Sequence, residues 1–157
     1  MFEKTCVLIK PDAVQRGLIG KIIERFEQKG LKIVGLKMIS VDDVLLSEHY
    51  SHLVDKPFFE GIKEFMKSSP LIAIALEGLD AVKAVRLIAG ITKAREADAG
   101  TIRGDFAMGM QANVIHASDS QENADKEIKR FFNKDEIFQY GRCDFQVVYN
   151  GETEGGR

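Results

Sequence analysis

The chain has 157 residues, of which 45% are hydrophobic and 29% are charged, a balance typical of one globular domain. Its formal net charge of −2 excludes a general affinity for nucleic acid or anionic membranes, so an anion site must be built from locally gathered Lys and Arg. Two cysteines, Cys6 and Cys143, have no metal-ligand spacing, which excludes a disulfide framework and a zinc site.

The first forty residues predict a strand, a helix and a second strand. The apolar run 5–9, stopped by a Lys-Pro pair, is typical of a strand buried on both faces. Asp12 is placed to cap the following helix, whose apolar residues recur at four-residue spacing until Gly30 ends it. The run 31–41 then predicts the second strand.

The middle of the chain predicts two short helices, a third strand and a longer helix. Asp42 caps a helical stretch through residue 50, and Pro57 starts the next helix. The apolar run 71–76 predicts a strand, after which Gly78 turns the chain into a helix that begins at Asp80.

Periodicity fails over residues 91–109, and a structureless loop of this length inside a compact domain is usually functional. Residues 112–117 predict the fourth strand. The Ser-Asp-Ser that follows at 118–120 consists of residue types that open a helix. The Gly-rich acidic end, residues 150–157, has nothing to bury, so we expect a flexible tail.

This order of elements gives two βαβ-like halves. It predicts a ferredoxin-like α+β sandwich in which helices cover a four-stranded antiparallel sheet. We find no repeat or linker, so residues 1–149 are expected to form one domain. No run approaches membrane-spanning length, and residues 1–10 lack the apolar core of a signal peptide, so we expect a cytoplasmic protein without a membrane partner.

The segment 113–120 holds the strongest candidate for chemistry, His116. It ends a β-branched run directly before a helix start, where α/β proteins place reacting groups and bind anions. From spacing alone, a packed or hydrogen-bonded histidine is the slightly favoured interpretation.

Two other motifs are weaker. The glycines at 17 and 20 lack both the spacing and the hydroxyl residue of a P-loop. His49 and His52 lie three apart on a predicted helix and could share a metal. They lack a carboxylate or thiol partner at ligand spacing, so we expect both to face solvent.

A series of segments, in order and at matching spacing, resembles the nucleoside diphosphate kinase family over residues 5–149. Any one segment would be a weak signal, whereas together they are highly specific. The segments are Ile9-Lys10-Pro11-Asp12, Val14-Gln15-Arg16-Gly17, Arg25-Phe26-Glu27 with Lys29-Gly30, Glu48-His49-Tyr50, Pro57-Phe58-Phe59, Gly100 to Phe106 and Asn113 to Ser120.

The resemblance implies a ping-pong reaction in which a nucleoside triphosphate gives its γ-phosphoryl group to His116 and a nucleoside diphosphate collects it. Neutral imidazole is a good nucleophile, and a covalent intermediate splits one transfer into two. The resemblance further implies that the δ nitrogen is phosphorylated and that Glu127 holds the other ring nitrogen, with Ser118 and Tyr50 as hydrogen-bond donors beside them. Taken alone, Glu127 would be a solvated helix residue.

The resemblance also places cationic and polar groups on the phosphates, namely Lys10, Arg86, Thr92 and Arg103. This explains how an acidic protein can bind a polyanion, because the basic groups converge. Mg²⁺ is expected to arrive with the nucleotide, bridging its phosphates without a direct protein ligand. Asp119 either contacts this ion through water or caps the following helix.

For the nucleoside, Phe58 matches the residue on which the base stacks, with Ile62 one turn further along. Asn113 and Lys10 are expected to hold the ribose. Because stacking uses the π-face that every base has, the resemblance implies broad base specificity and acceptance of both ribose and deoxyribose.

Three departures from the family pattern stand near the site. Ala117 replaces a common glycine, Lys93-Ala94 follows Thr92 where Asn-Pro is frequent, and His52 replaces a commonly acidic neighbour. The resemblance implies a homo-oligomer, either a hexamer or a tetramer.

Two alternatives use the same fold. An RNA-binding module should carry paired strand aromatics, which the runs 7–9 and 112–117 lack. A catalytically inactive nucleotide-binding scaffold should have lost His116 or an arginine, and this chain retains them.

Overall fold

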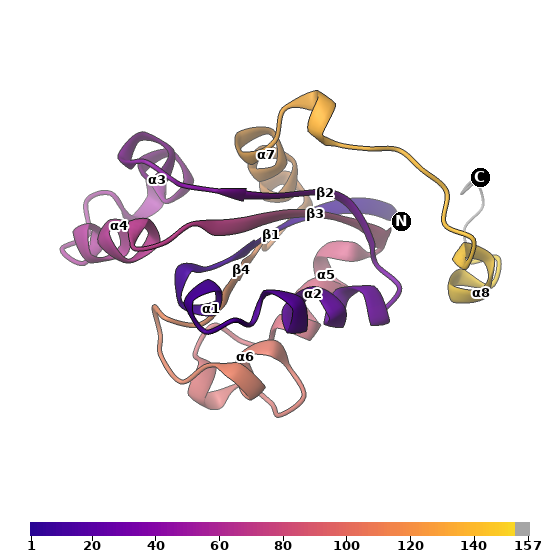
Figure 1. The fold of residues 1–157 in the computed structure, drawn as a ribbon, viewed down its shortest axis with the longest axis horizontal. Coiled ribbons are helices and arrows are strands. Elements are labelled where there is room, and N and C mark those ends of the chain that lie inside the picture. The colour runs from indigo at the N-terminus through magenta and orange to yellow at the C-terminus, as the bar shows by residue number, and fades with distance from the viewer. Residues whose placement is uncertain (153–157) are drawn as a thin grey trace.

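The computed structural model describes residues 1–152 and shows a four-stranded sheet between two layers of helices (Figure 1). The strands are β1 (Phe2–Ile9), β2 (Lys32–Ile39), β3 (Leu71–Leu79) and β4 (Ile115–Ala117). The helices are α1 (Pro11–Gln15), α2 (Ile19–Gln28), α3 (Asp43–His49), α4 (Phe59–Lys67), α5 (Ala81–Ala89), α6 (Ile102–Phe106), α7 (Gln121–Phe131) and α8 (Phe145–Tyr149). Short 3₁₀ turns are η1 (Ser51–Leu53), η2 (Ala94–Glu96) and η3 (Lys134–Glu136).

The sheet has the order β2-β3-β1-β4, and its strands pair antiparallel throughout. In the central strand β1, Cys6 lies opposite Ala75 of β3, and Leu8 lies opposite His116 of β4. Strands β1 and β2 therefore run in the same direction with β3 between them, joined by α1 and α2. This arrangement confirms the predicted ferredoxin-like α+β sandwich.

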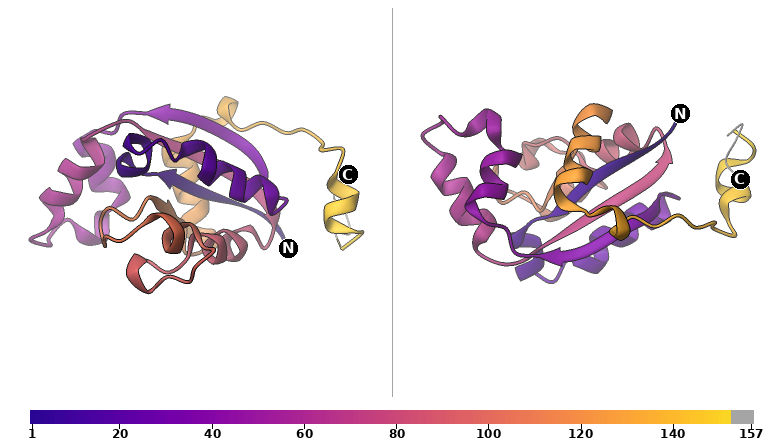
Figure 2. Two further views of the ribbon diagram at one scale, coloured as in Figure 1. Left: turned by 60° about the horizontal axis from the view of Figure 1, so that its bottom comes forward. Right: turned by 90° about the horizontal axis from the view of Figure 1, so that it is seen from above.

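The alternation of side chains along β1 divides the interior into two hydrophobic cores. Val7 and Ile9 face one core, which α2 and α5 cover, whereas Cys6 and Leu8 face the other, which α3, α4 and α7 cover. In the right-hand view of Figure 2, α7 lies over the strands. A strand buried on both faces explains the continuous apolar run. Burying one of these large apolar side chains, rather than leaving it exposed, stabilises the fold by about 1.5–3 kcal/mol.

Two local predictions are wrong. Asp12 does not cap a helix: α1 begins after Lys10, with Pro11 in its first turn, and the Asp12 carboxylate accepts from the backbone N–H of Val114 at 3.1 Å. Gly78 does not form a turn but lies within β3, opposite Glu3. A Cβ at this position would lie 2.7 Å from Cδ2 of Leu31 and 2.9 Å from the Tyr149 hydroxyl, so these two side chains would have to shift to make room for it.

The segment 91–109 is ordered rather than structureless. It contains η2 and α6, and the Thr101 hydroxyl caps α6 by accepting from the N–H of Gly104 at 3.0 Å. The fourth strand is also shorter than predicted, because Val114 adopts a left-handed backbone with φ of 66° and pairing starts only at Ile115. By contrast, α5 begins after Asp80 and ends at Gly90 as predicted.

The last helix of the described residues, α8, is one that the sequence pattern did not predict. An extended segment carries α8 to the end of the sheet where β1 begins (Figures 1 and 2). There the Phe2 ring lies 5.4 Å from the ring of Phe145, and the Tyr149 hydroxyl donates to the carbonyl of Gly30 at 3.1 Å. Of the predicted tail, residues 153–157 lie outside the described part of the chain. No helix within residues 1–152 is both long and apolar enough to cross a membrane.

Candidate functional site

One cavity of about 690 Å³ collects almost all of the predicted site residues. They come from segments far apart in the sequence: the ends of β1 and β4, the helices α4, α5, α6 and α7, and the loops between them. The predicted residues on its wall are Lys10, Tyr50, Phe58, Ile62, Arg86, Thr92, Arg103, Asn113, His116, Asp119 and Glu127. Ser118 lies behind this wall, fully buried.

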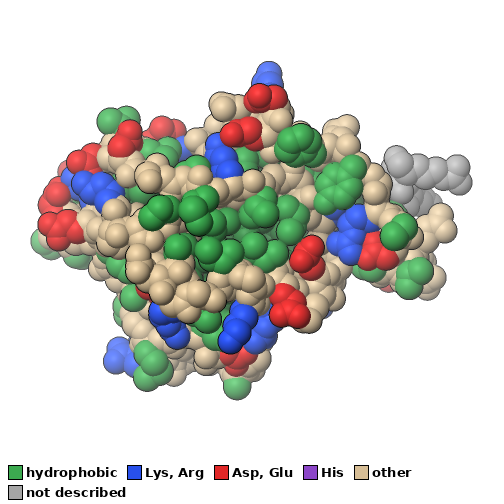
Figure 3. All heavy atoms as spheres, viewed as in Figure 1, with side chains coloured by type: hydrophobic (Ala, Val, Ile, Leu, Met, Phe, Trp, Pro, Cys, Tyr) green, Lys and Arg blue, Asp and Glu red, His purple; other side chains and the backbone are tan. Residues whose placement is uncertain are grey.

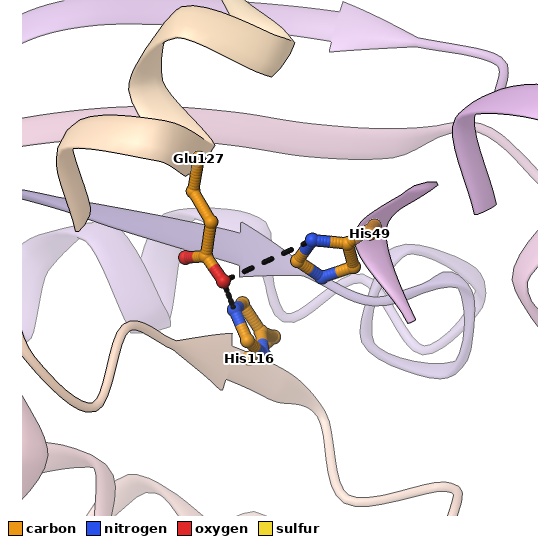
Figure 4. Close-up of side chains that lie close together, drawn as sticks. All are labelled: His49, His116 and Glu127. Carbon is orange, nitrogen blue, oxygen red and sulfur yellow. Dashed lines mark hydrogen bonds and ion pairs between the residues drawn. The ribbon is translucent and has the colours of Figure 1, made fainter. Parts of the chain in front are cut away.

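His116 is held at the middle of β4, with its side chain partly exposed to the cavity. Its Nε2 lies 2.9 Å from Oε1 of Glu127 (Figure 4). Because an ionised carboxylate can only accept, this bond places the proton on Nε2 and the lone pair on Nδ1. In the neutral form of the ring, this bond fixes its orientation and leaves the Nδ1 lone pair free.

Glu127 is itself fixed from behind by Ser118. The Ser118 hydroxyl lies 2.5 Å from Oε2 of Glu127 and 3.2 Å from the carbonyl of Cys6, and the N–H of Cys6 donates to it at 3.3 Å. A hydroxyl has one proton, and a charged acceptor binds it more strongly than a neutral carbonyl does. We therefore assign the proton to Glu127, so each carboxylate oxygen has one donor.

Tyr50 follows α3 and lies close to the same carboxylate. Burial, together with the negative charge of Glu127, raises the pKa of Tyr50 to about 12. The phenol therefore keeps its proton and remains a potential donor throughout the neutral range.

His49 contradicts the prediction that it faces solvent. Its side chain is 1% exposed and packs edge-on against the rings of His116 and Phe131, at 4.6 and 5.1 Å. Burial and the nearby positive groups lower the pKa of His49 to about 2, so the ring is neutral. His52, in η1, is exposed as predicted, although it reaches the cavity wall.

His49, His116 and Glu127 bring three potential metal ligands within 4.8 Å of one another. The carboxylate is already hydrogen-bonded to His116 and Ser118, and a guanidinium nitrogen of Arg130 lies 3.4 Å from Nδ1 of His49. A fixed positive charge at that distance opposes a bound cation. Figure 4 shows His116 hydrogen-bonded to Oε1 of Glu127, with Nδ1 of His49 3.8 Å from the same oxygen.

Lys10 projects from the end of β1 into the cavity. Its ammonium donates to Oδ1 of Asn113 at 2.7 Å and to the carbonyl of Gln111 at 3.3 Å. Burial, followed by the charge of Arg103, lowers the pKa of Lys10 to about 8, with Asp12 acting in the opposite direction. Lys10 is thus charged at neutral pH and sits where an anion would relieve the burial of that charge.

Arg103 is fixed by two backbone carbonyls, those of Gly90 at 2.8 Å and Ile115 at 2.7 Å. Burial and the neighbouring Arg86 lower the pKa of Arg103 to about 10. Asn113 is buried, and its amide donates to the carbonyl of Thr92 at 3.0 Å. These bonds hold the cationic wall in place without any ligand.

The rim of the cavity carries an exposed aromatic ring. Phe58 stands directly before α4 and is 54% exposed, with Ile62 on the following turn. Across the cavity, Ser120 rather than Asp119 caps α7, because its hydroxyl accepts from the N–H of Asn123. The carboxylate of Asp119 accepts from the Asn123 side chain at 2.6 Å, which lowers the pKa of Asp119.

The structure shows where the residues that depart from the family pattern lie and what they contact. Lys93 forms an ion pair with Glu96 in η2, and Ala94 is buried in the hydrophobic core. Ala117 is also buried, at the end of β4. Sequence reasoning did not single out Arg130, which lies one turn after Glu127 on α7 and contributes to the cavity wall.

Comparison with known proteins gives consistent results. The sequence model of the family described as "Nucleoside diphosphate kinase" matches residues 3–137. The nucleoside diphosphate kinase of Parabacteroides distasonis is 56% identical over 147 residues, which cover 94% of this chain and 96% of that protein. Human nucleoside diphosphate kinase A is 48% identical over 147 residues, covering 94% and 97%. The solved structure of a halophilic nucleoside diphosphate kinase from Halobacterium salinarum in complex with CDP has a TM-score of 0.92 and 45% identity, covering 95% of this chain and 99% of that one.

Proposed function

Because this chain belongs to the nucleoside diphosphate kinase family of phosphotransferases, we propose that it works by a ping-pong mechanism through His116. The γ-phosphoryl group of a nucleoside triphosphate moves to the imidazole and then to a nucleoside diphosphate. The observation that carries this proposal is the bond between Nε2 of His116 and Glu127, which leaves Nδ1 as the nucleophile.

In the first step, the Nδ1 lone pair attacks the γ-phosphorus and forms the N–P bond, while the bond from phosphorus to the β–γ bridging oxygen breaks. The nucleoside diphosphate leaves with that electron pair. The Nε2 proton stays on the ring, where Glu127 balances the positive charge that the imidazole gains. In the second step, a terminal oxygen of another nucleoside diphosphate attacks the same phosphorus and releases Nδ1.

Phosphoryl transfer depends mainly on positioning and on the stabilisation of spreading negative charge. Lys10 and Arg103 supply charges in fixed positions, because both are held by hydrogen bonds within the fold. Arg86 and Thr92 stand on the same wall and complete the phosphate site. Converging cations explain how a chain of net charge −2 can bind a polyanion.

The residues present fit a Mg²⁺ ion that the nucleotide carries. Among the described residues, Glu127 and Asp119 provide the carboxylates on the cavity wall, and both oxygens of Glu127 already accept a hydrogen bond. This leaves Asp119 as a water-mediated contact, in keeping with an ion that retains several waters. When bound, Mg²⁺ would neutralise and orient the phosphates.

For the nucleoside, we propose that the base stacks on the exposed face of Phe58 against Ile62, and that Asn113 and Lys10 hold the ribose. A relative was solved in complex with CDP, which supports a nucleotide in the corresponding place. Recognition by stacking predicts broad base tolerance and use of both ribo- and deoxyribonucleotides, without any nucleic acid partner.

We further propose that the chain assembles into a homo-oligomer in the cytoplasm. Figure 3 shows hydrophobic side chains gathered near the centre of the face that carries β2 and α2. Leu36 and Met38 are 50% and 57% exposed on β2, which forms an edge of the sheet. An uncovered apolar edge strand is a site for association, and a second copy would cover it. Sedimentation should therefore give a mass well above 17.5 kDa.

The test of the mechanism is incorporation of label from γ-labelled ATP. We expect one phosphoryl group per chain, stable in alkali and labile in acid, as a phosphohistidine is. His116→Ala should abolish the label, while His52→Ala, which removes an exposed histidine beside the cavity, should retain it. A His116→Ala protein that still becomes labelled would show that the nucleophile is a different residue.

A further inference from the structure

Two imidazoles stand beside one oxygen of Glu127. Nε2 of His116 lies 2.9 Å from Oε1, and Nδ1 of His49 lies 3.8 Å from the same atom (Figure 4). The second carboxylate oxygen is already engaged with Ser118. A movement of about 1 Å would bring His49 within hydrogen-bond distance of Oε1. If Nδ1 of His49 carried a proton, it would compete with His116 for its orienting acceptor.

Arg130 contacts the same Nδ1 atom. Its Nη1 lies 3.4 Å from Nδ1 of His49, and its Nε donates to the carboxylate of Glu48 at 3.0 Å. Arg130 follows Glu127 by three residues on α7 and therefore shares its face. A guanidinium can only donate, so beside it Nδ1 must be an acceptor. Glu48 precedes His49 on α3 and anchors the guanidinium.

We propose that Arg130 is a positioning residue that fixes the tautomer of His49 with its proton on Nε2, and thereby leaves Glu127 to His116 alone. The inference rests on the proposed function, in which the bond between Glu127 and His116 aims the nucleophile. Arg130 acts through His49 and makes no hydrogen bond to the nucleophile, Nδ1 of His116.

The surroundings of His49 keep its ring neutral. Burial is the main cause, and the positive groups around it act in the same direction, so its pKa falls to about 2. The titratable and charged groups that face the ring come from all of the elements packed on it: Tyr50 and His52 near η1, Lys10 after β1, His116 in β4, and Glu127 and Arg130 in α7. Between about pH 5 and 9 the ring therefore changes tautomer rather than charge.

Without Arg130 the balance between the tautomers would reverse. The Nε2 atom of His49 is buried and has no hydrogen-bond partner among residues 1–152, so the present tautomer leaves a donor unsatisfied. With the proton on Nδ1, the ring would instead donate to Oε1 of Glu127. The unsatisfied Nε2 donor and the new bond to Glu127 both favour protonation of His49 on Nδ1. The guanidinium of Arg130 is the group that opposes it.

The direct test is the tautomer of His49 measured by ¹⁵N NMR on protein labelled at its three histidines, without nucleotide. His49→Phe and His52→Gln assign the signals. We expect wild-type His49 to be protonated on Nε2 and the Arg130→Met protein to shift toward protonation on Nδ1. Lys129→Met, an exposed position on the same helix, should leave the tautomer unchanged.

The kinetic test uses the same variants. We expect Arg130→Met to lower kcat by about tenfold, equivalent to about 1.4 kcal/mol, with KM changed less than about twofold. In a His49→Phe background, where no imidazole competes, the same substitution should have no further effect on kcat.

The proposal is overturned if His49 stays protonated on Nε2 in Arg130→Met, or if wild-type His49 already carries its proton on Nδ1. It is also overturned if Arg130→Met lowers kcat equally in the His49→Phe background, because Arg130 would then act directly. The NMR measurement needs no turnover, so it decides this proposal even if the phosphohistidine mechanism fails.

Discussion

Replacing Ser118 by alanine tests whether the buried hydroxyl holds the catalytic carboxylate in place. Ser118 is fully buried, donates to Oε2 of Glu127 at 2.5 Å, and accepts from the N–H of Cys6 at 3.3 Å. Alanine removes both contacts and leaves one carboxylate oxygen without a donor in a buried position.

The expected loss follows from these two bonds. A hydrogen bond to a charged group contributes about 1.5–3 kcal/mol and a neutral one about 1 kcal/mol, so Ser118→Ala should lower the free energy of unfolding by about 3 kcal/mol. For a domain of this size, that corresponds to a fall in Tm of about 6–12 °C. Because Ser118 lies outside the cavity wall, we expect kcat to fall as Glu127 loosens, while KM stays nearly constant.

Urea unfolding at one fixed protein concentration measures the stability, since association would otherwise shift it. The matched control is Ser120→Ala, which removes the hydroxyl that caps α7 and should lower the free energy of unfolding by about 1 kcal/mol. If Ser118→Ala loses no more stability than this control, the hydroxyl does not support Glu127 as described.

Three further results are expected. Since the pKa of Lys10 is lowered to about 8, the free protein releases this proton as the pH rises through that value, whereas a bound phosphate would restore it. Nucleotide affinity measured by calorimetry should be constant below about pH 7 and fall by up to about tenfold per unit above about pH 8, and an affinity that stays flat to about pH 9.5 would contradict this. Phe58→Ala should weaken all nucleotides by a similar factor, about 1–3 kcal/mol in binding free energy, and strong loss for one base alone would refute stacking. A thiol reagent should label Cys143 in the folded protein and Cys6 only after unfolding, because Cys6 is buried and its pKa is raised; rapid labelling of both would show that β1 is exposed.

The elements with strong periodicity could be predicted from the sequence. The central strand β1 and the helices α2 and α5 carry continuous or helically spaced apolar residues, and their caps at Gly30 and Gly90 are local signals. Helix α8 has no such signal: it is five residues long, has no buried residue and no side-chain cap, and depends on ring contacts with Phe2.

The motif residues of the site could be predicted because they stand in segments that match the family. The surroundings of these residues could not be predicted from the sequence. His49 is buried by His116 and Phe131, which are more than sixty residues away in sequence, so neither spacing nor composition reveals its environment. Arg130 looks like an ordinary helix-surface residue until α7 packs beside α3 and brings it to Glu48. Asp12 and Gly78 were misjudged for the same reason, since their partners lie in distant segments.

The position of β1 in the sheet has a consequence during protein synthesis. This strand is synthesised before both of its partners, because β3 and β4 begin only at residues 71 and 115. The nascent chain therefore carries the apolar half of β1 without a pairing partner until β3 has been made. Slow folding follows from this arrangement, because the strands that pair are distant in sequence.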